Sequence, residues 1–121
     1  MRAQVTTRLN CATVTGALMP GARFRHNDAT PPAVEAPAMI AQACGFDAIF
    51  VDLEHSPISM SAASQVCVAA LGLGITPIAR VGSQHAIDAT RILDTGAQGV
   101  MVPHTQDLAQ AKAIVNNCKF P

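Results

Sequence analysis

The sequence predicts an α/β fold built from four consecutive βα units. From residue 12 onward, short apolar runs alternate with longer segments of helical periodicity, and Gly or Pro separates them. Half of the 121 residues are hydrophobic, 13% are charged and the formal net charge is zero, which favours a globular domain and excludes a disordered tail. With no Trp, no Tyr and only four Phe, the core must consist of small aliphatic side chains, as in layered α/β proteins.

The first unit offers two candidate strands, residues 12–18 and residues 22–25. The prolines Pro31, Pro32 and Pro37 follow. Because a proline inside a helix removes a hydrogen bond and clashes with the preceding turn, we expect the first helix to begin near Pro37 and to end before Gly45.

The second unit has the clearest strand, residues 48–52, whose unbroken apolar run is typical of a parallel strand covered on both faces. Either Ser59 or Ser61 caps the next helix, in which apolar residues recur at intervals of three and four. We expect Gly72 and Gly74 to end it.

The last two units repeat this pattern. They are a strand at residues 75–80, a helix at 84–93 capped by Ser83, a strand at 97–102, and a helix capped by Asp107 that runs through Val115. Right-handed crossovers assemble such units into either a doubly wound sheet or a (β/α)8 barrel. A barrel needs about 250 residues, so four units make half of one. A doubly wound domain usually carries a glycine-rich first turn, and the sequence has neither G-x-G-x-x-G nor G-x-x-x-x-G-K.

Composition also restricts partners and compartment. The balanced charge argues against nucleic acid, and no apolar run approaches the roughly 18 residues of a membrane helix. The four cysteines fit no C-x-x-C pattern, so we expect free thiols in a reducing, cytoplasmic compartment. Residues 1–30 carry arginines and threonines but no acidic residue before Asp28. They are either a leading strand with its loops or a transit segment, and the second reading makes the protein mitochondrial.

Polar side chains gather where the parallel strands end, which is where both architectures place ligand sites. The candidates at these ends are Asp52, Glu54, His55, Arg80 and His104. Asp94 lies beside them, at the foot of the third helix and just before the fourth strand. Each has an ordinary explanation as solvated charge, ion pair or turn residue. Together they supply a cation for an anionic substrate, an imidazole for proton transfer, and carboxylates to orient both.

Four segments in this order resemble the HpcH/HpaI aldolase family of class II, metal-dependent pyruvate aldolases and citrate-lyase-like proteins. They are residues 45–57 (GFDAIFVDLEHSP), 75–80 (ITPIAR), 93–104 (LDTGAQGVMVPH) and 118–121 (CKFP). The resemblance implies a (β/α)8 barrel, of which residues 31–121 would be a partial domain and residues 1–30 a poorly matching segment. It favours the barrel over the doubly wound sheet.

The resemblance also implies roles for these residues. Arg80 would hold the oxygens of pyruvate and offset the charge of the enolate. His55 would act through a metal-bound water as the acid/base for the aldol hydroxyl. Asp94 would support His55, while Asp52 and Glu54 would lie in the outer shell of a metal site. His104 would line the substrate pocket. The substrate would be a small 4-hydroxy-2-oxo acid, cleaved or formed through a pyruvate enolate.

The family's divalent metal, Mg²⁺ or Mn²⁺, is implied to bind a Glu and an Asp of the fifth and sixth strands, which lie beyond Pro121. We therefore expect this chain alone to bind no metal and to cleave no aldol. Incubating the purified chain with Mn²⁺ and a 4-hydroxy-2-oxo acid tests this expectation. Release of pyruvate well above that of a protein-free control would contradict it. The alternatives are a truncated, non-catalytic member acting as an oligomerising module, or an incomplete gene product. Half a barrel leaves two open sheet edges, so we also expect self-association or a homo-oligomer.

Overall fold

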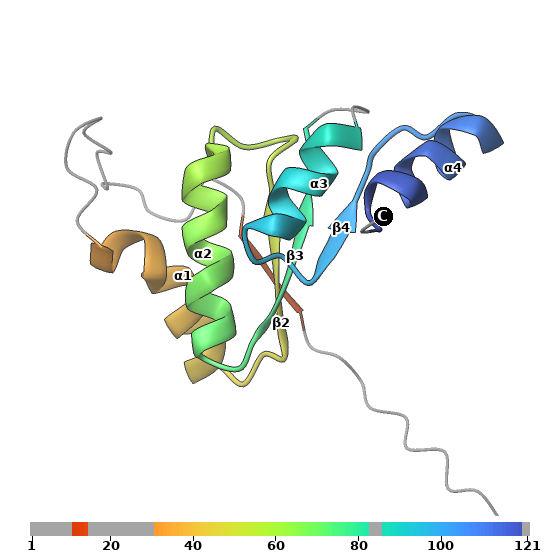
Figure 1. The fold of residues 1–121 in the computed structure, drawn as a ribbon. Coiled ribbons are helices and arrows are strands. Elements are labelled where there is room, and N and C mark those ends of the chain that lie inside the picture. The colour runs from red at the N-terminus through yellow and green to blue at the C-terminus, as the bar shows by residue number, and fades with distance from the viewer. Residues whose placement is uncertain (1–10, 15–30, 83–85, 120–121) are drawn as a thin grey trace, which may run out of the picture.

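A computed structural model of the chain describes residues 11–14, 31–82 and 86–119. These residues form a parallel four-stranded sheet with a helix after each strand (Figure 1). The strands are β1 (Cys11–Val14), β2 (Ala48–Asp52), β3 (Thr76–Arg80) and β4 (Gly99–Met101). The helices are α1 (Pro31–Ala43), α2 (Met60–Gly72), α3 (Ala86–Asp94) and α4 (Leu108–Asn117). None of the helices described is long and apolar enough to cross a membrane.

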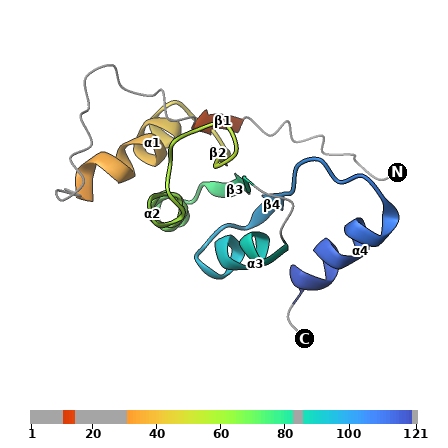
Figure 2. The same cartoon turned by 90° about the horizontal axis from the view of Figure 1, so that it is seen from above.

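The strand order decides between the two architectures. The strands are hydrogen-bonded in the order β1-β2-β3-β4, so the order never reverses as it does in a doubly wound sheet. Right-handed crossovers in a constant direction place successive helices on the same face of the sheet. Figure 2 shows the helices following one another along one side of the strands. This is the arrangement of consecutive units in a (β/α)8 barrel, as the sequence predicts.

The core lies between this helical side and the sheet, and it is built from small residues. Ile49 and Val51 of β2 are fully buried, and so are Ala63, Cys67 and Ala70 of α2. Alanines on the helices let them approach the strands closely, which explains why the protein needs so few aromatic residues.

Most of the predicted elements are confirmed. Strand β2 has the predicted bounds, and β3 and β4 lie inside the predicted spans. Of the two proposed caps, Ser59 begins α2: its Oγ accepts a hydrogen bond from the amide of Ala62 at 3.2 Å. Asp107 likewise caps α4 by accepting from the amide of Gln110 at 2.7 Å. The rival strand at 22–25 and the cap at Ser83 lie outside the described residues.

The predicted start of the first helix is wrong. Helix α1 begins at Pro31, and Pro37 lies in its interior. Pro31 and Pro32 occupy the first turn, where no amide hydrogen is needed inside the helix. At Pro37 one backbone hydrogen bond is missing, and the helix continues because residues such as Ala38 and Ala41 are buried against the core. Tertiary packing therefore outweighs the local cost of the proline.

The face of the sheet opposite the helices, called here the inner face, is only partly covered. Alternation along the strands places Phe50 and Asp52 on this face, with Ile78 and Arg80 beside them. Phe50 and Ile78 are partly exposed, and Met101, the register partner of Arg80, is 49% exposed. At the carboxyl ends of the strands, the inner face thus carries the charged pair Asp52 and Arg80, next to the apolar side chains of Phe50 and Ile78.

Candidate functional site

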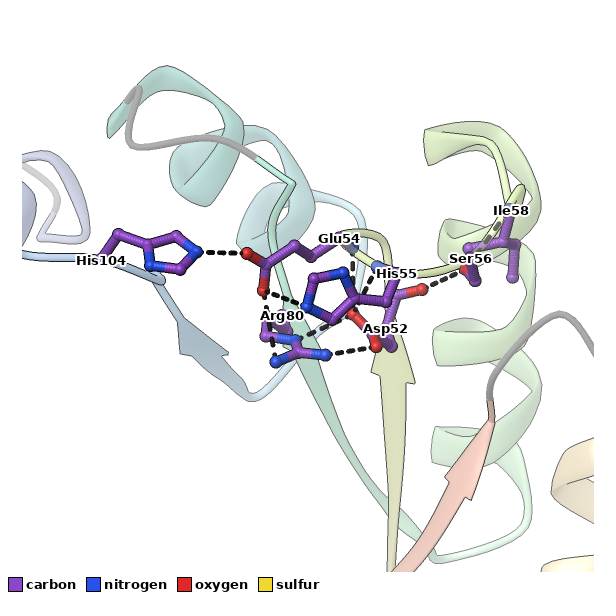
Figure 3. A network of polar contacts seen from close by, with 7 residues as sticks. All are labelled: Asp52, Glu54, His55, Ser56, Ile58, Arg80 and His104. Atoms are coloured by element: carbon purple, nitrogen blue, oxygen red, sulfur yellow. Dashed lines mark hydrogen bonds and ion pairs between the residues drawn. The ribbon is translucent and has the colours of Figure 1, made fainter.

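The polar residues converge at the carboxyl ends of β2, β3 and β4. Asp52 ends β2, Arg80 ends β3, and both are register partners across the sheet. Glu54 and His55 follow β2, and His104 follows β4. Figure 3 shows the five side chains directed toward one another above the strand ends. Parallel strands align their carboxyl ends at one edge, which is why residues up to 50 positions apart meet here.

Asp52 and Arg80 form the centre of the cluster. Arg80 Nε donates to Asp52 Oδ1 at 2.9 Å, and Nη2 donates to Oδ2 at 2.5 Å. The Asp52 side chain is 3% exposed and that of Arg80 is 25% exposed. The hydrogen bond from Arg80 lowers the pKa of Asp52 to about 2, with help from the amides of Glu54 and His55, although burial opposes the shift. Asp52 in turn raises the pKa of Arg80. The pair therefore stays ionised throughout the neutral range.

Asp52 also shapes the loop that follows β2. Its Oδ1 accepts hydrogen bonds from the amides of Glu54 at 3.0 Å and His55 at 3.3 Å. The Ser56 hydroxyl donates to the Asp52 carbonyl oxygen. An Asp side chain that binds amides two and three residues onward is a common way to fix a turn. One buried carboxylate thus sets the position of Arg80 and of the loop residues Glu54 and His55.

Glu54 connects the remaining groups. Its Oε2 lies 3.2 Å from Arg80 Nη1 and 3.6 Å from His55 Nε2, and its Oε1 lies 2.7 Å from His104 Nε2. The Glu54 side chain is 10% exposed, whereas those of His55 and His104 are 66% and 67% exposed. A nearly buried carboxylate therefore holds one guanidinium and two imidazoles that face solvent.

The contacts of Arg80 leave part of its donor capacity available. A guanidinium carries five N–H donors, and here Nε, one N–H of Nη2 and one of Nη1 face the two carboxylates. One N–H on each Nη atom therefore remains for an anion, on a side chain that is 25% exposed. The guanidinium is held rigidly, which suits it to bind two oxygens of a small carboxylate.

Comparison with known proteins identifies the setting of this cluster. The family model for HpcH/HpaI aldolase/citrate lyase matches residues 31–121. The chain belongs to the HpcH/HpaI family. Over 83 residues it is 45% identical to the 4-hydroxy-4-methyl-2-oxoglutarate aldolase of Hapsidospora irregularis, covering 68% of this chain and 31% of that protein. Over 84 residues it is 32% identical to the hydroxypyruvate/pyruvate aldolase of Sagittula stellata, covering 69% and 33%.

Solved structures agree with the fold. The HpcH/HpaI aldolase from Desulfitobacterium hafniense aligns with a TM-score of 0.69 at 22% identity, covering 93% of this chain and 38% of that one. The chain thus has the fold of a partial barrel of this family. It spans about a third of the length of the curated relatives that it matches.

One predicted site residue of this HpcH/HpaI chain lies apart from the cluster. Asp94 is the exposed last residue of α3, which ends before β4 begins. It therefore lies toward the amino ends of the strands, whereas the cluster lies at their carboxyl ends. Among the described residues no hydrogen bond or ion pair joins Asp94 to His55. The proposed support of His55 by Asp94 stays a prediction from the resemblance.

The structure adds two residues that the sequence did not single out. Ser56 stabilises the loop through the Asp52 carbonyl, and Gly82 lies against the other side of that loop. A Cβ at Gly82 would lie 2.9 Å from the carbonyl oxygen of Leu53, closer than packing allows. Gly82 could have been found from the sequence, because a glycine two residues beyond the end of a strand often marks a close approach of two backbone segments.

The fit of a divalent metal can be tested on the two carboxylates. The oxygens of Asp52 and Glu54 already face Arg80, backbone amides and imidazoles. In the part of the chain that the structure describes, no three His, Cys, Asp or Glu side chains are grouped to hold a metal ion. Among the described residues, Asp52 and Glu54 thus do not form a ligand set by themselves.

Proposed function

We propose that the cluster at the carboxyl ends of β2, β3 and β4 binds a small 2-oxo acid and contributes to carbon–carbon lyase chemistry of the aldolase type. The observation that carries the proposal is the Arg80 guanidinium, which is fixed side-on by Asp52 and keeps N–H donors on its two Nη atoms. The names of the relatives support the same class of substrate, since they are aldolases of 2-oxoglutarate derivatives and pyruvate.

In the proposed reaction, the remaining Nη donors of Arg80 bind oxygens of the 2-oxo acid. A base removes the proton from the C4 hydroxyl of a 4-hydroxy-2-oxo acid, and the C3–C4 bond breaks. The carbonyl product leaves, and the electron pair of that bond passes into the enolate of pyruvate. Protonation at C3 completes pyruvate. Arg80 offsets the negative charge of the enolate, because a fixed cation stabilises charge that develops beside it.

His55 is the proposed group that accepts and returns the proton. Its imidazole is 66% exposed, so substrate can reach it, and Glu54 holds its Nε2 at 3.6 Å. A carboxylate beside an imidazole orients the ring. Because the same Glu54 oxygen lies 3.2 Å from Arg80, the acid/base group and the anion-binding group share one support.

The test is an NMR titration that measures the binding of pyruvate to the 121-residue chain. We expect saturable shifts in wild type and their loss in R80A. The matched control is R91A, which removes an exposed guanidinium on α3 whose Nη1 lies 3.9 Å from Asp88. Equal pyruvate affinity in wild type, R80A and R91A would contradict the proposal, because binding would then not depend on the guanidinium of the cluster.

A second candidate function is an oligomerising module, favoured by the uncovered surfaces of the sheet. Within the described residues, β1 pairs only with β2 and β4 only with β3. An apolar groove runs beside the β4 edge, lined by Val100, Val102, Ala111, Ile114 and Val115. Unpaired edges next to apolar surface promote association between chains.

A further inference from the structure

We propose that His104 is a positioning residue that fixes the Glu54 carboxylate between Arg80 and His55. The inference rests on the proposed function of Arg80 and His55, and it adds a residue for which the family resemblance implies only pocket lining. His104 acts through Glu54 and needs no contact with substrate.

The first support is the contact itself. His104 Nε2 lies 2.7 Å from Glu54 Oε1, the shortest of the three contacts that Glu54 makes with charged or imidazole groups. It joins the turn after β4 to the loop after β2, across the end of β3 (Figure 3). Since Oε1 faces His104, Oε2 is left for Arg80 at 3.2 Å and His55 at 3.6 Å. The two oxygens of one carboxylate thus have separate partners.

The second support is the backbone of His104. Its φ is 58°, and it is the one residue other than glycine with a positive φ in the described ranges 11–14, 31–82 and 86–119. This conformation is unfavourable for an L-residue and is better tolerated by His and Asn than by most residues. Such strain tends to occur at functional sites, where the surrounding structure compensates for it. Here the left-handed turn follows Pro103 and directs the imidazole toward Glu54.

The third support is the freedom that Glu54 would otherwise have. A glutamate side chain has three rotatable bonds, and holding it in one conformation costs side-chain entropy. The contacts with Arg80 at 3.2 Å and with His55 at 3.6 Å both go to Oε2, and His55 is two-thirds exposed. Without the His104 contact, Oε1 loses its partner, and the carboxylate can rotate away from Arg80 and His55.

Two substitutions separate the side chain of His104 from its backbone. H104N keeps a residue that tolerates a positive φ but is too short to contact Glu54. H104Q has a donor nitrogen at a reach similar to that of Nε2 and serves as the conservative rescue. Q106A is the control, because it changes an exposed side chain of the same loop whose backbone amide, not its side chain, bonds to Gln110.

The measurements use the full chain labelled with ¹⁵N-histidine. One readout is the imidazole resonances of His55, and the other is the dissociation constant for pyruvate. We expect H104N to shift the His55 resonances and to weaken pyruvate binding by about threefold to tenfold, the usual worth of one hydrogen bond. H104Q should restore both readouts toward wild type, and Q106A should change neither.

The outcomes distinguish the two proposals. If R80A abolishes pyruvate binding while H104N leaves both the affinity and the His55 resonances as in wild type, the positioning role is wrong and the proposed function stands. If R80A leaves the affinity unchanged, the proposed function fails, and the His55 resonances alone decide whether His104 restrains Glu54. Equal losses in H104N and H104Q would also overturn the positioning role, because the donor would then not matter.

Discussion

The guanidinium of Arg80 is bound side-on by the carboxylate of Asp52, its register partner on the neighbouring strand. The two bonds, Nε to Oδ1 at 2.9 Å and Nη2 to Oδ2 at 2.5 Å, run across the carboxyl ends of β2 and β3. The backbone continues the connection, since the amide of Leu53 donates to the carbonyl of Arg80 at 2.9 Å. A buried ion pair of this kind holds two strand ends together and orients the donors that remain on Arg80.

Removing the charge of Asp52 is expected to destabilise the chain. In D52N the amide cannot form the paired bonds with the guanidinium. Arg80, whose side chain is only 25% exposed, then keeps only the contact with Glu54 at 3.2 Å to offset its charge. We expect a loss of about 2 to 4 kcal/mol in the free energy of unfolding. Urea unfolding at pH 7 and fixed protein concentration measures it. E35Q, at an exposed carboxylate of α1, should stay within about 0.5 kcal/mol of wild type.

The same pair predicts how stability depends on pH. The pKa of Asp52 is lowered from 3.8 to about 2 in the folded chain, so the pair stabilises fully above pH 4. That contribution, about 2 kcal/mol, is lost as the pH falls through 2. Urea midpoints at pH 5, 4, 3 and 2 should therefore show the gap between wild type and D52N closing from pH 4 downward. A gap that stays constant over this range would contradict the assignment.

The elements were predictable wherever one local signal dominated. The apolar run of residues 48–52 required a parallel strand, and Ser59 and Asp107 marked helix starts through their capping side chains. The start of α1 was not predictable in this way, because the rule against a proline inside a helix considers only the local sequence. The burial of residues such as Ala38 and Ala41, which favours a helix through Pro37, depends on tertiary contacts.

The site was predictable only in part. That polar residues at strand ends would meet followed from the parallel sheet, and Asp52, Glu54, His55, Arg80 and His104 do meet. Their pairing did not follow, because which carboxylate binds Arg80 depends on the register of β2 against β3. The contact of Glu54 with His104 depends on a turn with positive φ that no residue pattern marked. Asp94 was grouped with these residues, and only its role beside His55 came from the resemblance; the chain puts it at the end of α3, toward the other end of the strands.

Gly82 is expected to tolerate no side chain. A Cβ there would lie 2.9 Å from the carbonyl oxygen of Leu53, and this atom is backbone at the base of the loop that carries Glu54. G82A should therefore cost about 1 to 3 kcal/mol and weaken pyruvate binding, because the loop must move. G99A is the control: its Cβ would meet only the Ile78 side chain, at 3.5 Å or more. Equal stability of the two variants would show that the loop yields freely.

The cysteines should differ sharply in reactivity. Cys67 is fully buried on α2, and burial raises its pKa to about 11, whereas Cys44 is exposed. At pH 8 the Cys67 thiol, with a pKa of about 11, is about a hundredfold less ionised than it would be at its ordinary pKa of 9.0, and only the thiolate is alkylated. Iodoacetamide labelling with peptide mass spectrometry should modify Cys44 at least a hundredfold faster than Cys67. In denaturing urea the two rates should converge. Similar rates in the native chain would mean that α2 does not pack as described.

The open edge of β4 should make the 121-residue chain associate. The groove beside this edge contains Val115, which is 48% exposed, and Met101 of the inner face is 49% exposed. Size-exclusion chromatography with light scattering should give a mass above 12.6 kDa that rises with concentration. V115K should weaken association, because it places a charge in the groove. V68K makes the same change at a 59% exposed position of α2, away from the edge, and should leave association unaltered. A compact monomer with cooperative unfolding at all concentrations would instead indicate that the edges and the inner face are closed in solution.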